Sequence, residues 1–147
     1  MIRTQNPLDY WTNDSRVTID YQNYKNNEDL YKNFDALILP RRYGGLCLPM
    51  NEALMSGLPV IMTDISPNYD ILPKKWLIPS TISDKLFTRM IINVYKADAK
   101  LLGQKIDEFV NMSDQELNME KIEAFDLAMK HFDSDTLLPK YKEYMEL

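Results

Sequence analysis

The arrangement of short apolar runs constrains the fold of this chain more than any other feature. Four runs have the length of β-strands, and they occupy residues 17–21, 36–39, 59–63 and 76–78. The two middle runs show no alternation with polar residues, which is typical of strands whose two faces are both covered in a parallel sheet. The runs therefore predict a sheet that lies between layers of other structure.

Helical signals separate these runs. Between the first and second runs, Asn26 or Asn27 can cap a short helix. Between the second and third runs, residues 49–56 are predicted to form a helix that stops at Gly57. Strands that alternate with helices indicate an α/β fold with a three-layer, Rossmann-like parallel sheet.

The chain beyond residue 80 is predicted to be helical. Apolar residues recur there at helical spacing, first as Leu86, Phe87, Met90, Ile91 and Val94 and then as Leu101, Leu102, Ile106, Phe109 and Val110. The sequence SDQE, residues 113–116, is a capping box before a long helix, and a last helix is predicted for residues 136–144. We expect one domain over residues 1–147, with strands and helices alternating over 1–80 and helices over 81–147.

Composition excludes several classes of function. The net charge of −5 argues against nucleic acid or an anionic membrane as the main partner, although a local basic patch could still bind phosphate. One cysteine excludes an internal disulfide and an all-cysteine zinc site, and one histidine excludes sites built on several histidines. No stretch has the length and apolarity of a membrane span or of a signal peptide, so a cytoplasmic location is expected.

The sequence RRYGGLCL joins a predicted buried strand to a predicted helix. In open parallel sheets, ligands bind at the carboxyl ends of the strands, and Gly44 and Gly45 allow backbone to approach a ligand there. The start of a helix offers free N–H groups to phosphate oxygens, and Arg41 and Arg42 can add charge-assisted bonds. Glu52, near the start of the helix, can accept two bonds from a vicinal diol such as that of a ribose. These features fit a nucleotide that carries phosphates.

The same residues also have structural interpretations. A Gly-Gly pair between strand and helix is often only a tight turn, and Glu52 can interact with the helix dipole without any ligand. Arg41 and Arg42 are adjacent, so we do not expect both to face one site. Cys47 fits a small buried residue better than a nucleophile, and His131 fits a structural role. An unrelated nucleotide-binding α/β domain is disfavoured because the chain has no phosphate-loop or Gly-x-Gly-x-x-Gly motif.

Residues 34–64, FDALILPRRYGGLCLPMNEALMSGLPVIMTD, resemble the donor-binding segment of retaining glycosyltransferases of the GT-B type, the glycosyl transferases of group 1 or family 4-like. The pattern of that family is a strand ending in proline, then Arg-Tyr-Glu-Gly-Phe-Gly-Leu-Pro, a Glu-Ala pair and a Gly-x-Pro-Val-Ile strand. The resemblance implies a domain that binds a nucleotide diphosphate sugar for glycosyl transfer to an unknown acceptor. It implies no metal and no cofactor besides this substrate.

The resemblance also assigns residues. Glu52 matches the glutamate that binds the ribose hydroxyls in the family. Arg41, Arg42 and Gly44, singled out above from the residues themselves, complete the expected donor-binding set. Four residues match the loop whose backbone amides meet the donor sugar and diphosphate: Gly45, Leu46, Cys47 and Leu48. Gly44 stands where the family usually has a first glutamate that holds a sugar hydroxyl, so no catalytic residue is assigned.

The resemblance further implies that the donor domain is N-terminally truncated, with residues 1–5 forming at most the end of a second strand. The acceptor-binding domain would lie in another chain or segment, so the isolated chain is expected not to transfer sugar. In the strand order 3-2-1-4-5-6, a missing first strand leaves residues 36–39 with an unpaired edge. We expect either that residues 1–21 pack directly against residues 36–39 or, in preference, that two chains form a homodimer through that edge. The alternative function is a non-catalytic interaction or assembly module.

Overall fold

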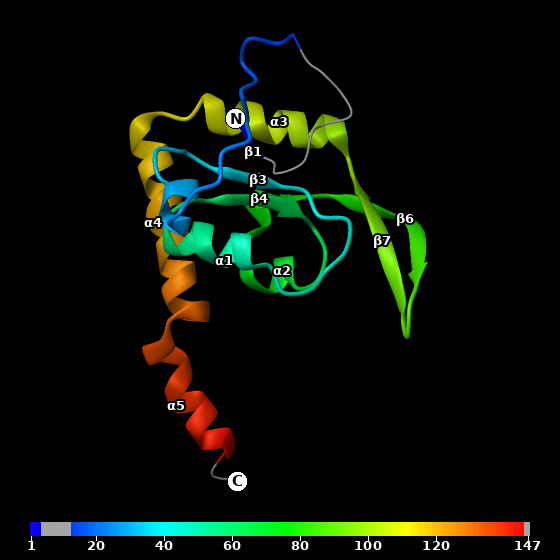
Figure 1. Ribbon diagram of the computed structural model, residues 1–147, viewed down its shortest axis with the longest axis vertical. Helices are drawn as coiled ribbons and strands as arrows, with labels where there is room; N and C mark the ends of the chain where they lie inside the picture. The colour runs from blue at the N-terminus through cyan, green and yellow to red at the C-terminus, as the bar shows by residue number, and fades with distance from the viewer. Residues whose placement is uncertain (4–12, 146–147) are drawn as a thin grey trace. The chain divides into compact units, whose positions relative to one another are not determined.

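The computed structural model describes residues 1–3 and 13–145, in two units that are considered separately (Figure 1). In the unit Met1–Leu30, β1 (Ile2–Arg3) pairs in parallel with β2 (Ile19–Asp20), with Ile2 opposite Ile19. The 3-10 helix η1 (Asn27–Leu30) follows. The strand predicted at residues 17–21 is thus present over two residues, and the helix predicted within residues 26–34 is a 3-10 helix that ends at Leu30.

The second unit, Tyr31–Leu147, contains a parallel sheet with the strand order β3-β4-β5. Its strands are β3 (Leu37–Leu39), β4 (Val60–Thr63) and β5 (Leu77–Ile78), each within or at the end of a predicted run. All four residues of the central strand β4 are at most 1% exposed, because the strand has a neighbour on each side and covered faces. The predicted parallel α/β fold is confirmed, and the homodimer through β3 stays a prediction.

Helix α1 (Leu48–Met55) connects β3 to β4 and turns its buried residues Met50, Ala53 and Leu54 toward the core. Gly57 follows the helix with a φ of +70°, a backbone conformation that favours glycine over residues with a side chain. The predicted helix and its glycine stop are therefore confirmed. The short helix α2 (Asn68–Ile71) follows β4.

The prediction of a helix over residues 86–94 is wrong. Residues 80–97 form an antiparallel hairpin of β6 (Ser80–Phe87) and β7 (Ile91–Ala97), which projects from the rest of the second unit in Figure 1. The sequence IINVY within β7 is rich in β-branched residues, which favour strands. Thr88 closes the turn through bonds from its backbone N and its Oγ1 to the Met90 carbonyl, at 3.1 and 2.8 Å. The spacing of apolar residues over residues 86–94 alone did not distinguish a helix from a β-hairpin.

The helical prediction holds from residue 99 onward. Helix α3 (Ala99–Val110) is capped by the Asp98 side chain, and α4 (Asp114–Phe132) begins with the capping box that the sequence predicted between Ser113 and Glu116. The last helix is α5 (Ser134–Met145).

Helix α4 is tied to the sheet by a buried tryptophan. Trp76, at the end of the 3-10 helix η2 (Lys74–Trp76), is 0% exposed, and its Nε1 donates to Oε2 of Glu120 at 2.5 Å. The other oxygen of Glu120 lies 2.6 Å from Nζ of Lys75, which also pairs with Glu123 at 2.6 Å. One carboxylate on α4 therefore satisfies a buried donor directly before β5.

His131, in the last turn of α4, gives the fold a pH dependence. Burial lowers the pKa of His131 below its ordinary value of 6.5, and the nearby Lys130 and Lys140 lower it further. Well above pH 6.5 the imidazole is neutral in both the folded and the unfolded state. As the pH falls below 6.5, the unfolded chain binds the proton first, so stability is lost until the pH passes the folded-state pKa.

We therefore expect a lower free energy of unfolding at about pH 5.5 than at about pH 7.5, measured by urea denaturation. The difference between the two pH values should shrink in His131→Asn, whose side chain does not titrate. An unchanged difference in that variant would show that other groups cause the effect.

Candidate functional site

The loop between β3 and α1, residues 40–47, starts at the carboxyl end of a parallel strand, as the sequence predicted. Gly45 has a φ of +125°, which residues with a side chain rarely adopt. Nη1 of Arg41 donates to the Gly45 carbonyl at 2.9 Å and so closes the loop on itself. Arg41 thus supports the loop backbone in addition to bringing a positive charge to it.

Gly44 lies directly against the loop that follows β4. A Cβ atom on Gly44 would lie 1.9 Å from the Ser66 carbonyl oxygen, far inside any allowed contact. The loop that carries Ser66 is itself fixed, because Nδ2 of the buried Asn68 donates to the Thr63 carbonyl at 2.9 Å. The glutamate usual in the resembled family therefore cannot be accommodated here unless Ser66 moves, which gives the glycine a structural reason.

The start of α1 presents backbone donors. Among the residues that the structure describes, none accepts a hydrogen bond from the amides of Leu46, Cys47 or Leu48. The side chains of Leu46 and Leu48 are exposed, whereas Cys47 is buried, as expected for a small apolar residue rather than a nucleophile. Backbone N–H groups at the start of a helix are donors of the kind that bind phosphate oxygens.

Glu52 is held in place by a tyrosine that the sequence did not single out. Oη of Tyr31 donates to Oε2 of Glu52 at 2.7 Å across 21 positions of sequence. Burial and then the bond to Glu52 raise the pKa of the Tyr31 phenol well above its usual value, so the phenol stays a donor at physiological pH. The bond from Tyr31 orients the Glu52 carboxylate, a group that can accept bonds from several donors. No local pattern marks Tyr31 for this role.

A pocket of about 460 Å³ lies between the same loop and the β6–β7 hairpin. Its lining residues come from both elements: Pro40, Arg41, Arg42, Ser83, Asp84, Tyr95, Lys96 and Ala97. The backbone N–H of Tyr95 donates to the Arg42 carbonyl at 2.6 Å and joins the hairpin to the loop. Both arginines are among the lining residues of this pocket. The expectation that they do not both face the donor site stays a prediction.

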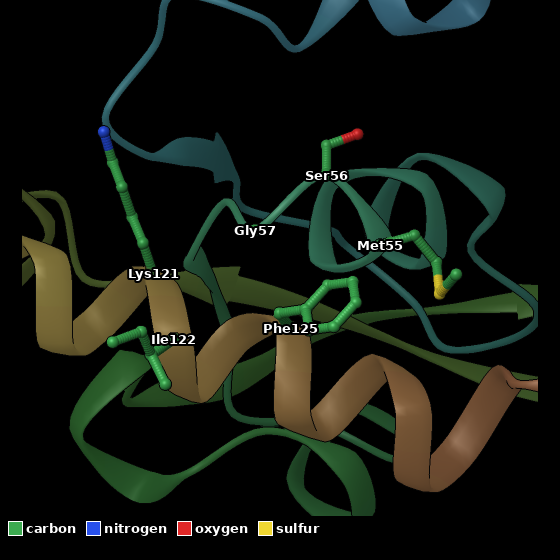
Figure 2. Close-up of a pocket in the computed structure, with 6 residues that line it drawn as sticks. All are labelled: Met55, Ser56, Gly57, Lys121, Ile122 and Phe125. Atoms are coloured by element: carbon green, nitrogen blue, oxygen red, sulfur yellow. The ribbon is translucent and has the colours of Figure 1, made fainter.

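A second hollow, of about 440 Å³, lies between the end of α1 and α4 (Figure 2). The residues around it are Met55, Ser56, Gly57, Lys121, Ile122 and Phe125, and the surface they expose is mostly apolar. Nζ of Lys121 is engaged by Oδ1 of Asp35 at 2.9 Å. This hollow therefore offers little to a phosphate, in contrast to the pocket beside the hairpin.

The described residues offer no ready metal site. Residues 1–3 and 13–145 contain no group of three histidine, cysteine, aspartate or glutamate side chains placed to hold a metal ion. No helix in this part of the chain is long and apolar enough to cross a bilayer.

The parallel sheet, the glycine-containing loop at its carboxyl end and the helix that follows define a Rossmann-like domain. Residues 10–123 match the family of glycosyl transferases group 1. Because the match covers most of the 147 residues, the chain belongs to this family, and its general function is glycosyl transfer. No curated protein and no solved structure shows significant similarity to the chain.

Proposed function

We propose that this chain binds a nucleotide diphosphate sugar and supplies the donor site for glycosyl transfer. The observation that carries the proposal is the placement of Glu52. Glu52 is on helix α1, and Tyr31 orients its carboxylate. The amides of residues 46–48, at the start of this helix, have no acceptor among the described residues. A diol acceptor and a phosphate site thus lie on one short helix, as a nucleotide requires.

Each part of the proposed site has a chemical role. The ribose hydroxyls donate to Glu52, and the diphosphate accepts bonds from the amides of residues 46–48. During transfer, negative charge grows on the departing diphosphate, and the amides and the positive dipole end of α1 stabilise it. Fixed donors of this kind reduce the need for a metal ion, so we propose a metal-free site. The acceptor and the residue that assists its attack are not assigned.

A non-catalytic binding module is the second candidate, and Gly44 is the observation that favours it. The carboxylate that usually holds a sugar hydroxyl in the resembled family is absent, and the Ser66 carbonyl occupies the space beside Gly44. Such a module would keep nucleotide binding without turnover. Hydrolysis or transfer of a bound nucleotide sugar would exclude this candidate, whereas binding alone would favour it.

The donor site is tested by calorimetry with UDP, GDP and ADP on the wild type and on Glu52→Gln. Glutamine keeps an acceptor for Tyr31 but removes the charge that strengthens bonds from the diol. We expect binding of the preferred nucleotide to weaken about tenfold or more, because a hydrogen bond to a charged group contributes about 1.5–3 kcal/mol.

Two further variants serve as controls for this experiment. Tyr31→Phe keeps the carboxylate and removes only its orienting bond, so we expect a smaller loss of affinity than in Glu52→Gln. Glu123→Gln removes the same charge from α4 and should bind as the wild type does. Equal affinity of the wild type and Glu52→Gln would remove Glu52 from the site and overturn the proposal.

A further inference from the structure

The pocket between the β3–α1 loop and the hairpin gathers positive charge. Arg41, Arg42 and Lys96 line it, and Asp84 is the one acidic residue among its lining residues. Within residues 1–3 and 13–145, none of these three cations forms an ion pair with a carboxylate. Three cations beside a single carboxylate leave net positive charge, and an anion in the pocket reduces the repulsion among the cations.

The hairpin is shaped to face this pocket. The register of β6 against β7 shifts between Ile82 and Asp84, which places a β-bulge at Ser83. The bulge lies at the pocket, because Ser83 and Asp84 are both among its lining residues. Oγ of Ser83 donates to the Val94 carbonyl at 3.2 Å and joins the bulge to β7.

The backbone segments that carry the cations are joined to one another. The bond from the Tyr95 amide to the Arg42 carbonyl, at 2.6 Å, joins the neighbour of Lys96 to the backbone of Arg42. Nη1 of Arg41 is held by the Gly45 carbonyl. A site whose backbone is already in place spends less of its binding free energy on ordering the chain.

We propose that this pocket is a phosphate subsite, in which Lys96 of the hairpin acts with Arg42 and Arg41. Guanidinium groups bind phosphate through paired N–H bonds, and lysine adds a compact positive charge. Its volume lies within the range typical of small-molecule sites. The source of the phosphate rests on the proposed donor site: it is either the diphosphate of the nucleotide sugar or a phosphate group on the acceptor.

Pyrophosphate is the probe, because it carries the charge without a nucleoside. Calorimetry of the full chain should show pyrophosphate binding that weakens about tenfold or more in Lys96→Met, which loses one charge-assisted contact. Lys85→Met is the matched control, because Lys85 lies on the same hairpin but does not line the pocket. Asp84→Asn should instead strengthen binding, since it removes the one acidic group of the lining.

Amide shifts locate the bound anion. In ¹H–¹⁵N spectra, pyrophosphate should move the signals of Arg42, Tyr95 and Lys96 in the wild type and not in Lys96→Met. Equal weakening in Lys96→Met and Lys85→Met would show that only overall charge matters, and it would overturn the proposal. Absence of binding to the wild type, or unchanged affinity in Lys96→Met, would overturn it as well.

Two further comparisons distinguish the donor diphosphate from an acceptor phosphate, and the proposed donor site from the proposed phosphate subsite. Competition between UDP and pyrophosphate assigns the pocket to the donor diphosphate, whereas simultaneous binding of both assigns it to an acceptor phosphate. If Glu52→Gln bound UDP as tightly as the wild type while Lys96→Met still bound pyrophosphate more weakly, the donor site would be rejected and the phosphate subsite kept.

Discussion

Replacing Gly44 by alanine should lower the free energy of unfolding by about 1–3 kcal/mol, the range for adding atoms to a packed position. The new Cβ would lie 1.9 Å from the Ser66 carbonyl oxygen, and that oxygen belongs to backbone. The Asn68 side chain donates to the Thr63 carbonyl and so restrains the loop that carries Ser66. This restraint opposes the backbone movement that would be needed to make space for the new Cβ atom. Urea denaturation at neutral pH measures the change.

Gly103→Ala is the matched control for this prediction. Gly103 is inside α3, and a Cβ atom there would meet no described residue within 4 Å apart from its chain neighbours and the backbone of its own helix. Alanine there should raise the free energy of unfolding by about 0.5–1 kcal/mol, because glycine is unfavourable within helices. If Gly44→Ala were as stable as the wild type, the close contact between the two loops would be wrong.

A glutamate side chain at position 44 would carry the same Cβ strain and more atoms. Restoring the glutamate of the resembled family by Gly44→Glu should therefore destabilise the protein rather than improve sugar binding. The loop that carries Ser66 lies against Gly44 and leaves no space for a larger residue. A single substitution at position 44 therefore does not restore the family pattern.

Removing the Glu120 carboxylate should also have a large effect. Glu120→Ala leaves the indole N–H of the fully buried Trp76 without its acceptor and takes one of two partners from Lys75. An unsatisfied buried donor costs about 1–3 kcal/mol, and we expect a loss of that size in the free energy of unfolding. The Trp76 fluorescence should change as well, because its polar contact is lost.

Glu123→Ala separates the buried contact from the surface charge. Glu123 binds the same Lys75 at 2.6 Å, but its side chain is 39% exposed and the indole N–H of Trp76 donates to Glu120 instead. Exposed ion pairs contribute about 0–1 kcal/mol, so this variant should stay close to the wild type in stability. Similar losses in both variants would mean that the Trp76 bond contributes little.

The sequence predicted those parts of the fold that depend on burial pattern and end signals. The run at residues 59–63 indicates a strand covered on both faces, and the structure buries β4 completely. The capping box at Ser113 and the glycine stop at Gly57 mark helix ends through local hydrogen bonding and backbone conformation. Local chemistry of this kind is visible without tertiary structure.

The hairpin and the Tyr31 contact show why the rest was not predicted. Over residues 86–94 the apolar spacing fits a helix, but β-branched residues and cross-strand pairing favour the hairpin. The bond from Tyr31 to Glu52 depends on a contact between segments that are distant in sequence. The lining of the pocket at Arg42 and Lys96 likewise depends on how two elements far apart in sequence come together.

The hairpin begins and ends at one place, because Ser80 and Ala97 are partners in its register. The chain therefore leaves β5 and enters α3 at adjacent points, whatever the number of residue pairs between them. Insertions or deletions of such pairs would change the reach of the hairpin without moving β5 or α3. Evolution can in this way vary the surroundings of Lys96 separately from the core, so that new ligand preferences need not be gained at the expense of folding.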